Sequence, residues 1–476
     1  MNLYGISGIK DIVYDSRKAE SGMLFVCLRG AVTDGHKYAK SAYEKGCRIF
    51  LCEEKLSLPE DSIQIIKKDT RLELAKISAE FFDYPAKKLK IIGVTGTKGK
   101  TSVELYIYNS LLRAGKKAGL ISTNGIFFDD EHILTANSTP ESYELHKTFD
   151  TMLKHDCEYV VVEVSSQAYK TNRVYGLEFD IGIYTNLSED HIGEGEHADF
   201  DEYKSCKTQL FKNSKVSLIN IDDDYADEMI ANSNGNVVTY AVKNNKSDYT
   251  ASNIELWRES NSFGIRYILN NSVDVIINSP GIFNIYNSLA TISACDILSI
   301  DAKCVLDTLR NVSLSGRFEI VDALPYATFV IDYAHNELSM RNVLETIRTY
   351  NPKRIVCLFG SVGGRTQLRR GGLGRIAGEL ADFCVITSDN PDYEKPLNIM
   401  YDIERGLKTN ENPCDYIMIA DRAEAIKYAV DNAQDGDVVL LTGKGHEDYQ
   451  LIEGVKVPFC ERDLIIQAAQ TILSYR

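Results

Sequence analysis

A short glycine-rich stretch holds the residues best suited to bind a phosphate group. It follows the apolar run 90–95, precedes a helix-compatible segment up to about residue 112, and reads Gly96, Thr97, Lys98, Gly99, Lys100, Thr101 and Ser102. Glycines in such a turn let backbone N–H groups close around an anion, and the N-terminus of the following helix adds positive potential. Lys100 can then reach the outer phosphates and Thr101 can hold Mg²⁺. The stretch predicts a nucleoside triphosphate site, with ATP and Mg²⁺ as cofactors.

The loop departs from the strict phosphate-loop spacing at one position. The strict pattern has its first glycine five residues before Gly99, where this chain has Val94, and Gly93 lies one residue too early. An ordinary glycine-rich turn between a strand and a helix is the alternative interpretation. The strand before the loop and the Gly-Lys-Thr-Ser sequence at the helix start favour a variant of the ATP loop.

Polar residues follow two other apolar runs of the same region. Glu163 follows 159–162, and His191 comes shortly after 181–187. The carboxyl ends of parallel strands line the ligand crevice of an open sheet, so both side chains are expected near the loop. A carboxylate and an imidazole beside Thr101 make a reasonable Mg²⁺ set. A helix-capping Glu163 and a plain loop histidine remain the alternative.

The fold class predicted from the alternation of strands and helices is α/β with three domains. Residues 1–88 form a small N-terminal α/β domain, and residues 89–313 form a central parallel-sheet ATPase domain with the loop variant. Residues 314–476 form a C-terminal Rossmann-like α/β domain. An alternating polar patch at 248–277 predicts a hairpin insertion.

Composition and charge exclude several classes of function. The 476 residues exceed the size of one core, and the net charge of −15 argues against a nucleic-acid surface, which needs clustered Lys and Arg. No apolar run approaches the ~20 residues that span a membrane, and a signal-peptide pattern is lacking. The 11 cysteines are scattered without a C-x-x-C pair. We therefore expect a reduced cytoplasmic enzyme with no membrane insertion.

Taken together, the motifs resemble those of the Mur ligase family, ATP-dependent amide-forming enzymes of peptidoglycan precursor synthesis. The motifs that match in order are 96–101, 163–166, 185–187 with 190–191, Asn284 and Asn287, 316–319, and 332–335. Within the family, 15–17, 34–36, 389–391 and 443–447 look like the branch that adds a diamino acid to UDP-MurNAc-L-Ala-D-Glu. Residues 163–169 and 191–197 look most like its lysine-adding, Gram-positive group. A monomer is expected.

The resemblance implies a role for each matching residue. Lys100, Glu163, His191 and Lys207 would be catalytic, and magnesium would be placed by Thr101, Glu163, His191 and Lys207. ATP would be bound by residues 96–102, with Asn284 and Asn287 by the adenine, Arg317 on the phosphates and Asp332 on the ribose. The UDP-MurNAc-dipeptide would be held by Ser16, Ala31, Val32, Thr33, Asn137, Ser138, Thr139, Ser165, Thr171 and Arg173. The incoming amino acid would be surrounded by Arg365, Asp389, Asn390, Pro391, Asp392, Gly443 and Glu447.

The chemistry requires the same parts. A carboxylate acylates poorly, so ATP converts it to an acyl phosphate that an amine attacks, and two anions must be held in line by Mg²⁺ and cationic side chains. In the family, a lysine at the place of Lys207 is carbamylated by CO₂ and becomes a magnesium ligand. A solvated helix lysine is the alternative for Lys207.

The identity of the diamino acid rests on one residue. Diaminopimelate-adding relatives read Asp-Asn-Pro-Arg, in which the arginine can pair with the distal carboxylate. This chain has Asp392 in the fourth place, which would repel that carboxylate and attract an ammonium. The prediction is L-lysine, with meso-diaminopimelate as the alternative. More remote alternatives are a folylpolyglutamate synthase-like ligase and an inactive binding homologue.

Overall fold

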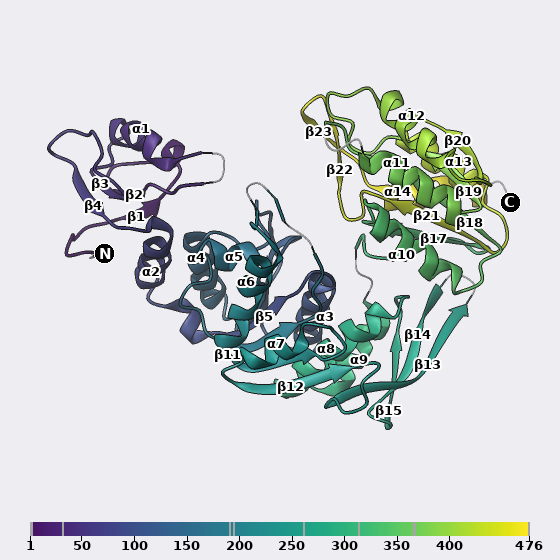
Figure 1. Ribbon diagram of the computed structural model, residues 1–476, viewed down its shortest axis with the longest axis horizontal. Helices are drawn as coiled ribbons and strands as arrows, with labels where there is room; N and C mark the ends of the chain where they lie inside the picture. The colour runs from purple at the N-terminus through teal and green to yellow at the C-terminus, as the bar shows by residue number, and fades with distance from the viewer. Residues whose placement is uncertain are drawn as a thin grey trace. The chain divides into compact units, whose positions relative to one another are not determined.

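The computed structural model describes residues 3–30, 33–189, 192–193, 196–259, 262–312, 315–364 and 368–474. The chain divides into two compact units (Figure 1). The first unit comprises residues 1–250 and 286–308, and the second comprises residues 251–285 and 309–476. Each unit is described by itself.

The first unit begins with a small parallel sheet in the order β1-β2-β3-β4. Its strands are Asp11–Val13, Met23–Val26, Ile49–Cys52 and Ile63–Ile66, and its helices are α1 (Ala39–Glu44) and α2 (Thr70–Phe81). Asp69 begins α2 by accepting a hydrogen bond from the Leu72 N–H at 2.9 Å, which satisfies a donor that the helix itself leaves free. Helix α2 packs on α4 (Ser142–Lys154).

The larger sheet of the first unit runs in the order β12-β11-β10-β5-β9-β6-β7-β8. It is parallel from β12 to β6, and β7 and β8 are antiparallel. Its strands are Lys90–Thr95 (β5), Ala118–Ser122 (β6), Gly125–Phe128 (β7), Glu131–Ile133 (β8), Tyr159–Glu163 (β9), Phe179–Tyr184 (β10), Ser214–Asn220 (β11) and Asn236–Ala241 (β12). Strand β5 therefore lies inside the sheet, where the predicted loop begins.

Helices cover this sheet. They are Lys100–Arg113 (α3), Ser142–Lys154 (α4), Ser166–Lys170 (α5), Phe200–Lys212 (α6), Ala226–Ala231 (α7), Phe283–Ile297 (α8) and Ala302–Asn311 (α9). Helix α3 packs on β6 and β9, and α6 packs on β10 and β5. Gly93 in β5 permits the close approach of α6, because a β-carbon there would lie 2.9 Å from Leu210 Cδ1 of that helix.

The second unit contains a sheet in the order β16-β17-β21-β18-β19-β20, in which β16 alone of these strands runs antiparallel to its neighbour. Its strands are Glu319–Leu324 (β16), Ala327–Asp332 (β17), Arg354–Phe359 (β18), Phe383–Ile386 (β19), Asp415–Met418 (β20) and Asp437–Thr442 (β21). Its helices are Glu337–Arg348 (α10), Leu368–Leu380 (α11), Pro396–Leu407 (α12), Arg422–Asp431 (α13) and Glu461–Ser474 (α14).

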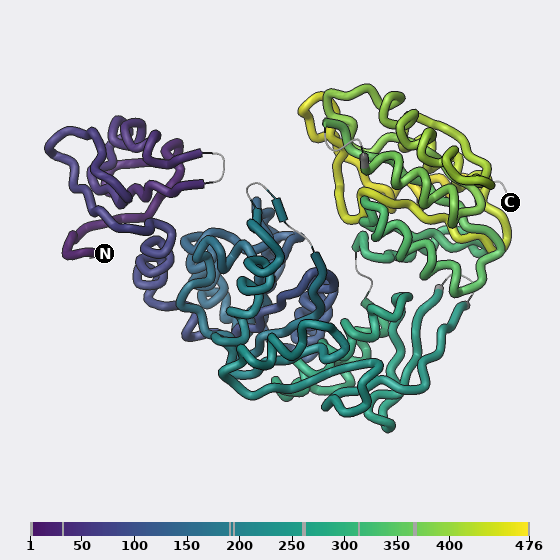
Figure 2. The backbone as a smooth tube through the Cα atoms, in the orientation of Figure 1, coloured from purple at the N-terminus to yellow at the C-terminus, as the bar shows by residue number. Residues whose placement is uncertain are grey.

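Both faces of this sheet are buried. Ile355 and Cys357 of β18 pack with α10, α11 and α12, whereas Val356 and Leu358 pack with α13 and α14. A strand covered on both faces reads as a continuous apolar run, which is what the sequence shows at 355–359. Figure 2 shows the yellow C-terminal segment returning beside the green strands of the same unit.

Antiparallel hairpins complete the second unit. Strands β13 (Tyr249–Glu259), β14 (Ser262–Leu269) and β15 (Val273–Ile277) pair in that order, and β22 (Tyr449–Ile452) pairs with β23 (Val455–Pro458). The predicted α/β class and the predicted hairpin at 248–277 are confirmed. Across the described ranges, the structure contains no helix with the length and apolar character that crossing a membrane requires.

Candidate active site

The predicted phosphate loop, residues 96–102, joins β5 to α3 in the first unit. Gly96 and Gly99 have φ angles of +145° and +84°, a region that favours glycine. A β-carbon at Gly96 would collide with Thr185 Oγ1, and one at Gly99 would lie 2.5 Å from Asn287 Oδ1. Gly99 precedes α3 without a side-chain cap, so the first N–H groups of α3 are left to an anion. The local geometry suits a phosphate.

Lys100 lies over this loop. Its Nζ donates to the carbonyl oxygens of Gly96 at 3.0 Å and Thr97 at 3.2 Å. The same nitrogen lies 3.8 Å from Glu163 Oε1. The ammonium is therefore held at the mouth of the loop, between the backbone and a carboxylate.

Glu163 ends β9 and faces the loop, as the sequence predicts. Parallel pairing sets Glu163 beside Val94 of β5, and the side chain is 5% exposed. Its Oε2 accepts hydrogen bonds from Thr123 Oγ1 at 2.7 Å and from the Thr123 N–H at 3.3 Å. Thr123 was not predicted, and only the β9–β6 pairing brings it here. These two bonds orient the carboxylate while Oε1 stays toward Lys100.

Lys207 of α6 contacts the same loop, although it lies 111 residues after Gly96 in the sequence. It is 2% exposed, its Nζ donates to Gly96 O at 2.8 Å, and it lies 4.6 Å from the Tyr203 ring centroid. The structure therefore brings Lys207, Lys100 and Glu163 to one place. A hard cation such as Mg²⁺ fits this set, because the Glu163 carboxylate and the Thr101 hydroxyl supply oxygen ligands.

Four predicted site residues lie outside the described part of the chain: Ala31, Val32, His191 and Arg365. Ser16 lies in the short helix Ser16–Lys18 and Thr33 accepts the Gly30 N–H through its carbonyl at 2.8 Å. Both therefore lie on turns of the small N-terminal sheet.

Predicted peptide-binding residues gather behind Glu163. Thr139 Oγ1 donates to Glu163 O at 2.6 Å and lies 3.2 Å from Ser165 Oγ, and Thr123 Oγ1, which donates to Glu163, lies 3.0 Å from Ser138 Oγ. Arg173 donates to Thr139 O at 2.9 Å. Thr171 differs, because its hydroxyl donates to Gln167 O within its own helical turn at 2.6 Å.

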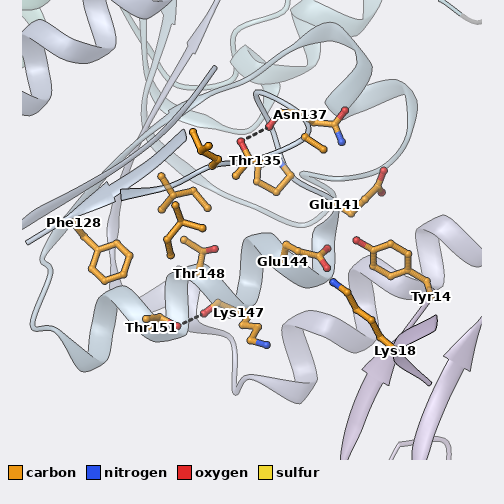
Figure 3. Close-up of a pocket in the computed structure, with 15 residues that line it drawn as sticks. Tyr14, Lys18, Phe128, Thr135, Asn137, Glu141, Glu144, Lys147, Thr148 and Thr151 are labelled. Carbon is orange, nitrogen blue, oxygen red and sulfur yellow. Dashed lines mark hydrogen bonds between the residues drawn. The ribbon is translucent and has the colours of Figure 1, made fainter. Parts of the chain in front are cut away.

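A cavity of about 430 Å³ lies beside this group (Figure 3). Asn137 is at its edge, Phe128 forms part of an apolar wall, and Tyr14, Lys18 and Glu144 gather at a polar end. Burial raises the pKa of Glu144, and burial together with Glu144 raises the pKa of Tyr14. The cavity joins residues from the small sheet and from α4, a proximity that no local pattern in the sequence indicates.

The sequence also missed a buried carboxyl in the first unit. Glu104 on α3 is fully buried, and its Oε2 accepts a hydrogen bond from Ser122 Oγ at 2.8 Å. Burial, and next the nearby Glu163, hold the pKa of Glu104 well above its usual value. Its position four residues after Lys100, on the same helix face, was the available signal.

Two residues predicted to contact adenine share helix α8 but differ in surroundings. Asn284 is buried and donates to Ser279 Oγ at 2.9 Å and to Pro280 O at 2.7 Å. Asn287 lies against the phosphate loop at Gly99. Asn284 thus fixes the turn before α8, whereas Asn287 is the one placed at the loop.

In the second unit, Asp332 and Arg317 lie at the carboxyl end of β17. Asp332 accepts the Phe318 N–H and the Ala334 N–H, each at 2.8 Å, and the Arg317 guanidinium lies 5.0 Å from the Tyr333 ring centroid. The Asp332 carboxylate is therefore engaged in bracing two turns, a role that the sequence did not indicate.

The remaining predicted amino-acid residues meet around a lysine that was not predicted. We call Asp389, Asn390, Lys444 and Glu447 the C-terminal polar cluster. Lys444 Nζ donates to Asn390 Oδ1 and to Glu447 Oε2, each at 3.1 Å, and Asn390 Nδ2 donates to Glu447 Oε2 at 2.9 Å. Burial raises the pKa of Asp389, against the opposing effects of Arg422 and Lys444. The cluster is a buried charge network at the ends of β19 and β21.

Three residues next to the cluster fix the backbone around it. Asp392 has a φ of +51° and accepts the Gly454 N–H at 2.8 Å, so this carboxylate braces the turn between β22 and β23. Pro391 precedes it and is buried. A β-carbon at Gly443 would lie 2.6 Å from Asp389 Oδ2, so the close approach there requires glycine.

Comparison with known proteins covers nearly the whole chain. Residues 8–87 match the model described as Mur ligase family, catalytic domain, residues 94–295 match the Mur ligase middle domain, and residues 316–445 match the Mur ligase glutamate ligase domain. A UDP-N-acetylmuramoyl-L-alanyl-D-glutamate--2,6-diaminopimelate ligase from Caldanaerobacter subterraneus subsp. tengcongensis is 39% identical over 96% of this chain and 94% of its own length. A protein of the same name from Clostridioides difficile is 40% identical over the same shares. A solved structure of a ligase with that name has a TM-score of 0.71 and 28% identity, covering 97% of this chain and 95% of its own.

Proposed function

The chain belongs to the Mur ligase family, and on that premise we propose that it adds a diamino acid to UDP-N-acetylmuramoyl-L-alanyl-D-glutamate, with 2,6-diaminopimelate as the preferred amino acid. It is an ATP-dependent ligase that forms amide bonds. The observation that supports the substrate is the name shared by relatives 39% and 40% identical over 96% of the chain. We propose the cytoplasm as the site of the reaction, because its substrates are ATP and a UDP-linked precursor.

The proposal assigns one task to each predicted domain. Residues 1–88 hold the UDP end through Ser16 and residues 31–33, residues 89–313 hold ATP, and residues 314–476 hold the amino acid. The peptide end lies at Thr139, Ser165 and Arg173, whose contacts join them to Glu163. This arrangement supports transfer of a phosphoryl group from ATP to the dipeptide carboxylate.

Residues of the phosphate loop would position the phosphates of ATP. Lys100 brings positive charge to the phosphates, and the N-terminus of α3 adds donors. Mg²⁺, when bound, neutralises charge on the transferred phosphoryl group and would be held by Thr101, Glu163, His191 and Lys207, the last as a carbamate. The buried Lys207 amine at Gly96 O suits that modification, because a carbamate needs an uncharged amine in a desolvated place.

The proposed amino acid differs from the sequence prediction of L-lysine. That prediction treated Asp392 as a free negative charge, but its carboxylate accepts the Gly454 N–H and is partly committed to the hairpin turn. The relatives' names support diaminopimelate. L-lysine is the second candidate, since position 392 offers no cation for a distal carboxylate.

A competition assay tests the proposal. The enzyme is given UDP-MurNAc-L-Ala-D-Glu, ATP and equal amounts of meso-diaminopimelate and L-lysine, and products are separated by mass. The expected result is a higher kcat/KM for diaminopimelate and release of ADP that depends on both substrates. A higher kcat/KM for lysine would restore the alternative, and no ligation of either would refute the proposed function.

A further inference from the structure

Lys444 is enclosed among residues that were predicted to surround the amino acid. Its side chain is 0% exposed and that of Glu447 is 18% exposed. Glycines on both sides, Gly443 with φ +108° and Gly445 with φ +55°, permit the turn that directs Lys444 inward. A lysine is rarely buried unless its charge is paired, so its place here calls for an explanation.

The contacts of Lys444 form a closed triangle with Asn390 and Glu447. Lys444 Nζ donates to Asn390 Oδ1 and Glu447 Oε2, and Asn390 Nδ2 donates to the same Glu447 oxygen. Asn390 Oδ1 also accepts the Leu451 N–H at 2.9 Å. One oxygen of Glu447 is therefore held twice, which fixes the direction of its carboxylate.

The ammonium also balances a second carboxyl. Lys444 Nζ lies 3.8 Å from Asp389 Oδ1, and the Asp389 side chain is 5% exposed. The carboxylates of Asp389 and Glu447 repel each other, and the repulsion is strong because both are largely buried. The ammonium of Lys444 lies close to both carboxylates and offsets this repulsion. Removing the cation would let Glu447 turn away toward solvent.

We infer that Lys444 is a positioning residue that holds Glu447 in the orientation needed to receive the amino group of the incoming amino acid. The inference rests on the proposed function, since Glu447 acts here as a group that contacts the amino acid. Lys444 itself acts through Glu447, because its Nζ donates to Asn390 Oδ1 and Glu447 Oε2, both of which are protein acceptors within the cluster. A substitution should therefore affect the amino acid and leave ATP binding unchanged.

The test compares four full-length proteins: the parent, Lys444→Met, Glu447→Gln and the double variant. We expect Lys444→Met to raise KM for the amino acid about tenfold or more, while KM for ATP and for the UDP-substrate stays within about twofold. In the Glu447→Gln background, Lys444→Met should change KM for the amino acid by less than about twofold, because the group it positions is already altered. Lys444→Arg, which keeps the charge, should recover part of the loss.

Lys427→Met is the matched control, since Lys427 is an exposed lysine of the same unit that pairs with Asp431. It should leave every KM unchanged. Equal effects of Lys444→Met in both backgrounds, or a KM within about twofold in a folded variant, would overturn the inference. If Lys444→Met does not fold, the double variant replaces it in the test, because the double variant removes both charges of the pair together. A KM for the amino acid far above that of Glu447→Gln would then refute the inference.

The same experiments distinguish a failure of the proposed function from a failure of the inference about Lys444. A parent that ligates neither diamino acid refutes the proposed function alone. The four proteins are then compared with whichever amino acid from a panel of the standard twenty and ornithine the parent accepts, because the contacts of Lys444 do not depend on its identity. A parent that ligates no amino acid and binds none by calorimetry overturns both.

Discussion

The phosphate loop of the first unit and the C-terminal polar cluster of the second unit place charge by different means. In the loop, backbone geometry at Gly96 and Gly99 comes first, and Lys100 and Lys207 rest on backbone carbonyls. In the cluster, side chains hold one another, and Lys444 is 0% exposed. The glycines and Lys100 of the loop come from one short stretch, to which Lys207 is added from α6, whereas the side chains of the cluster are held by partners from two distant segments. A loop lysine should therefore matter for the reaction, and a cluster residue should matter for the reaction and for stability.

Lys100→Ala gives the largest expected effect and tests the loop. Removing the ammonium takes away charge that matters most as the phosphoryl group transfers, and we expect kcat to fall by about a thousandfold. Because Lys100 contacts backbone carbonyls and no core, the midpoint of thermal unfolding should stay close to that of the parent. Ligation rate and unfolding are measured on the same sample. Near-normal turnover in the folded variant would exclude the phosphate-loop assignment.

Lys207→Ala comes second and tests whether the buried amine becomes a magnesium ligand. We expect a loss of about a hundredfold or more in kcat, with partial recovery on adding a small carboxylate such as formate or acetate, which can occupy the space left by a carbamate. Lys204→Ala is the control on the same helix, because Lys204 pairs with Asp201 and Glu228. A fully active Lys207→Ala protein, or an unmodified lysine in a structure of the active enzyme, would refute carbamylation.

Arg422 lies buried beside the cluster and tests how far buried charge in the second unit matters for stability. Its guanidinium donates to Glu461 Oε1 at 2.9 Å, to Ser388 O at 3.0 Å and to Thr442 O at 2.8 Å, and burial raises the pKa of Glu461. Arg422→Met strands the Glu461 charge and should lower the free energy of unfolding by about 3–5 kcal/mol. Arg422→Met with Glu461→Gln should lose clearly less. The single tryptophan, Trp257, lies in the second unit, so its fluorescence during urea unfolding reports that unit. Equal losses in the single and double variants would show that the ion pair is not what matters.

These cases also show how far the sequence alone can predict. The loop could be predicted because strand, glycines, lysine and threonine lie within thirteen residues, and Glu163 because parallel strands end at one edge. Lys444 and Thr123 could not be placed, because their partners come from other strands and helices. The bond between Asp392 and the Gly454 N–H could not be predicted for the same reason, since the two residues lie 62 positions apart. Local sequence patterns identify the charged side chains, and tertiary contacts decide which of them are already paired within the protein.

Asp392 supplies the smallest expected effect and the finest comparison. Asp392→Asn keeps an oxygen for the Gly454 N–H and tolerates the positive φ of +51°, so it removes the charge alone. A partly exposed charge contributes about 0.2–1 kcal/mol. The ratio of kcat/KM for diaminopimelate to that for lysine should therefore rise by about threefold, because repulsion of the distal carboxylate is relieved. The ratio is measured in one pot with both amino acids, and unfolding serves as the control for the hairpin turn.

Asp392→Arg should raise the ratio further if position 392 faces the amino acid, at a cost in stability from losing the bond to Gly454. A ratio unchanged in both variants would mean that Asp392 only braces the turn and that the choice of amino acid is made elsewhere in the second unit.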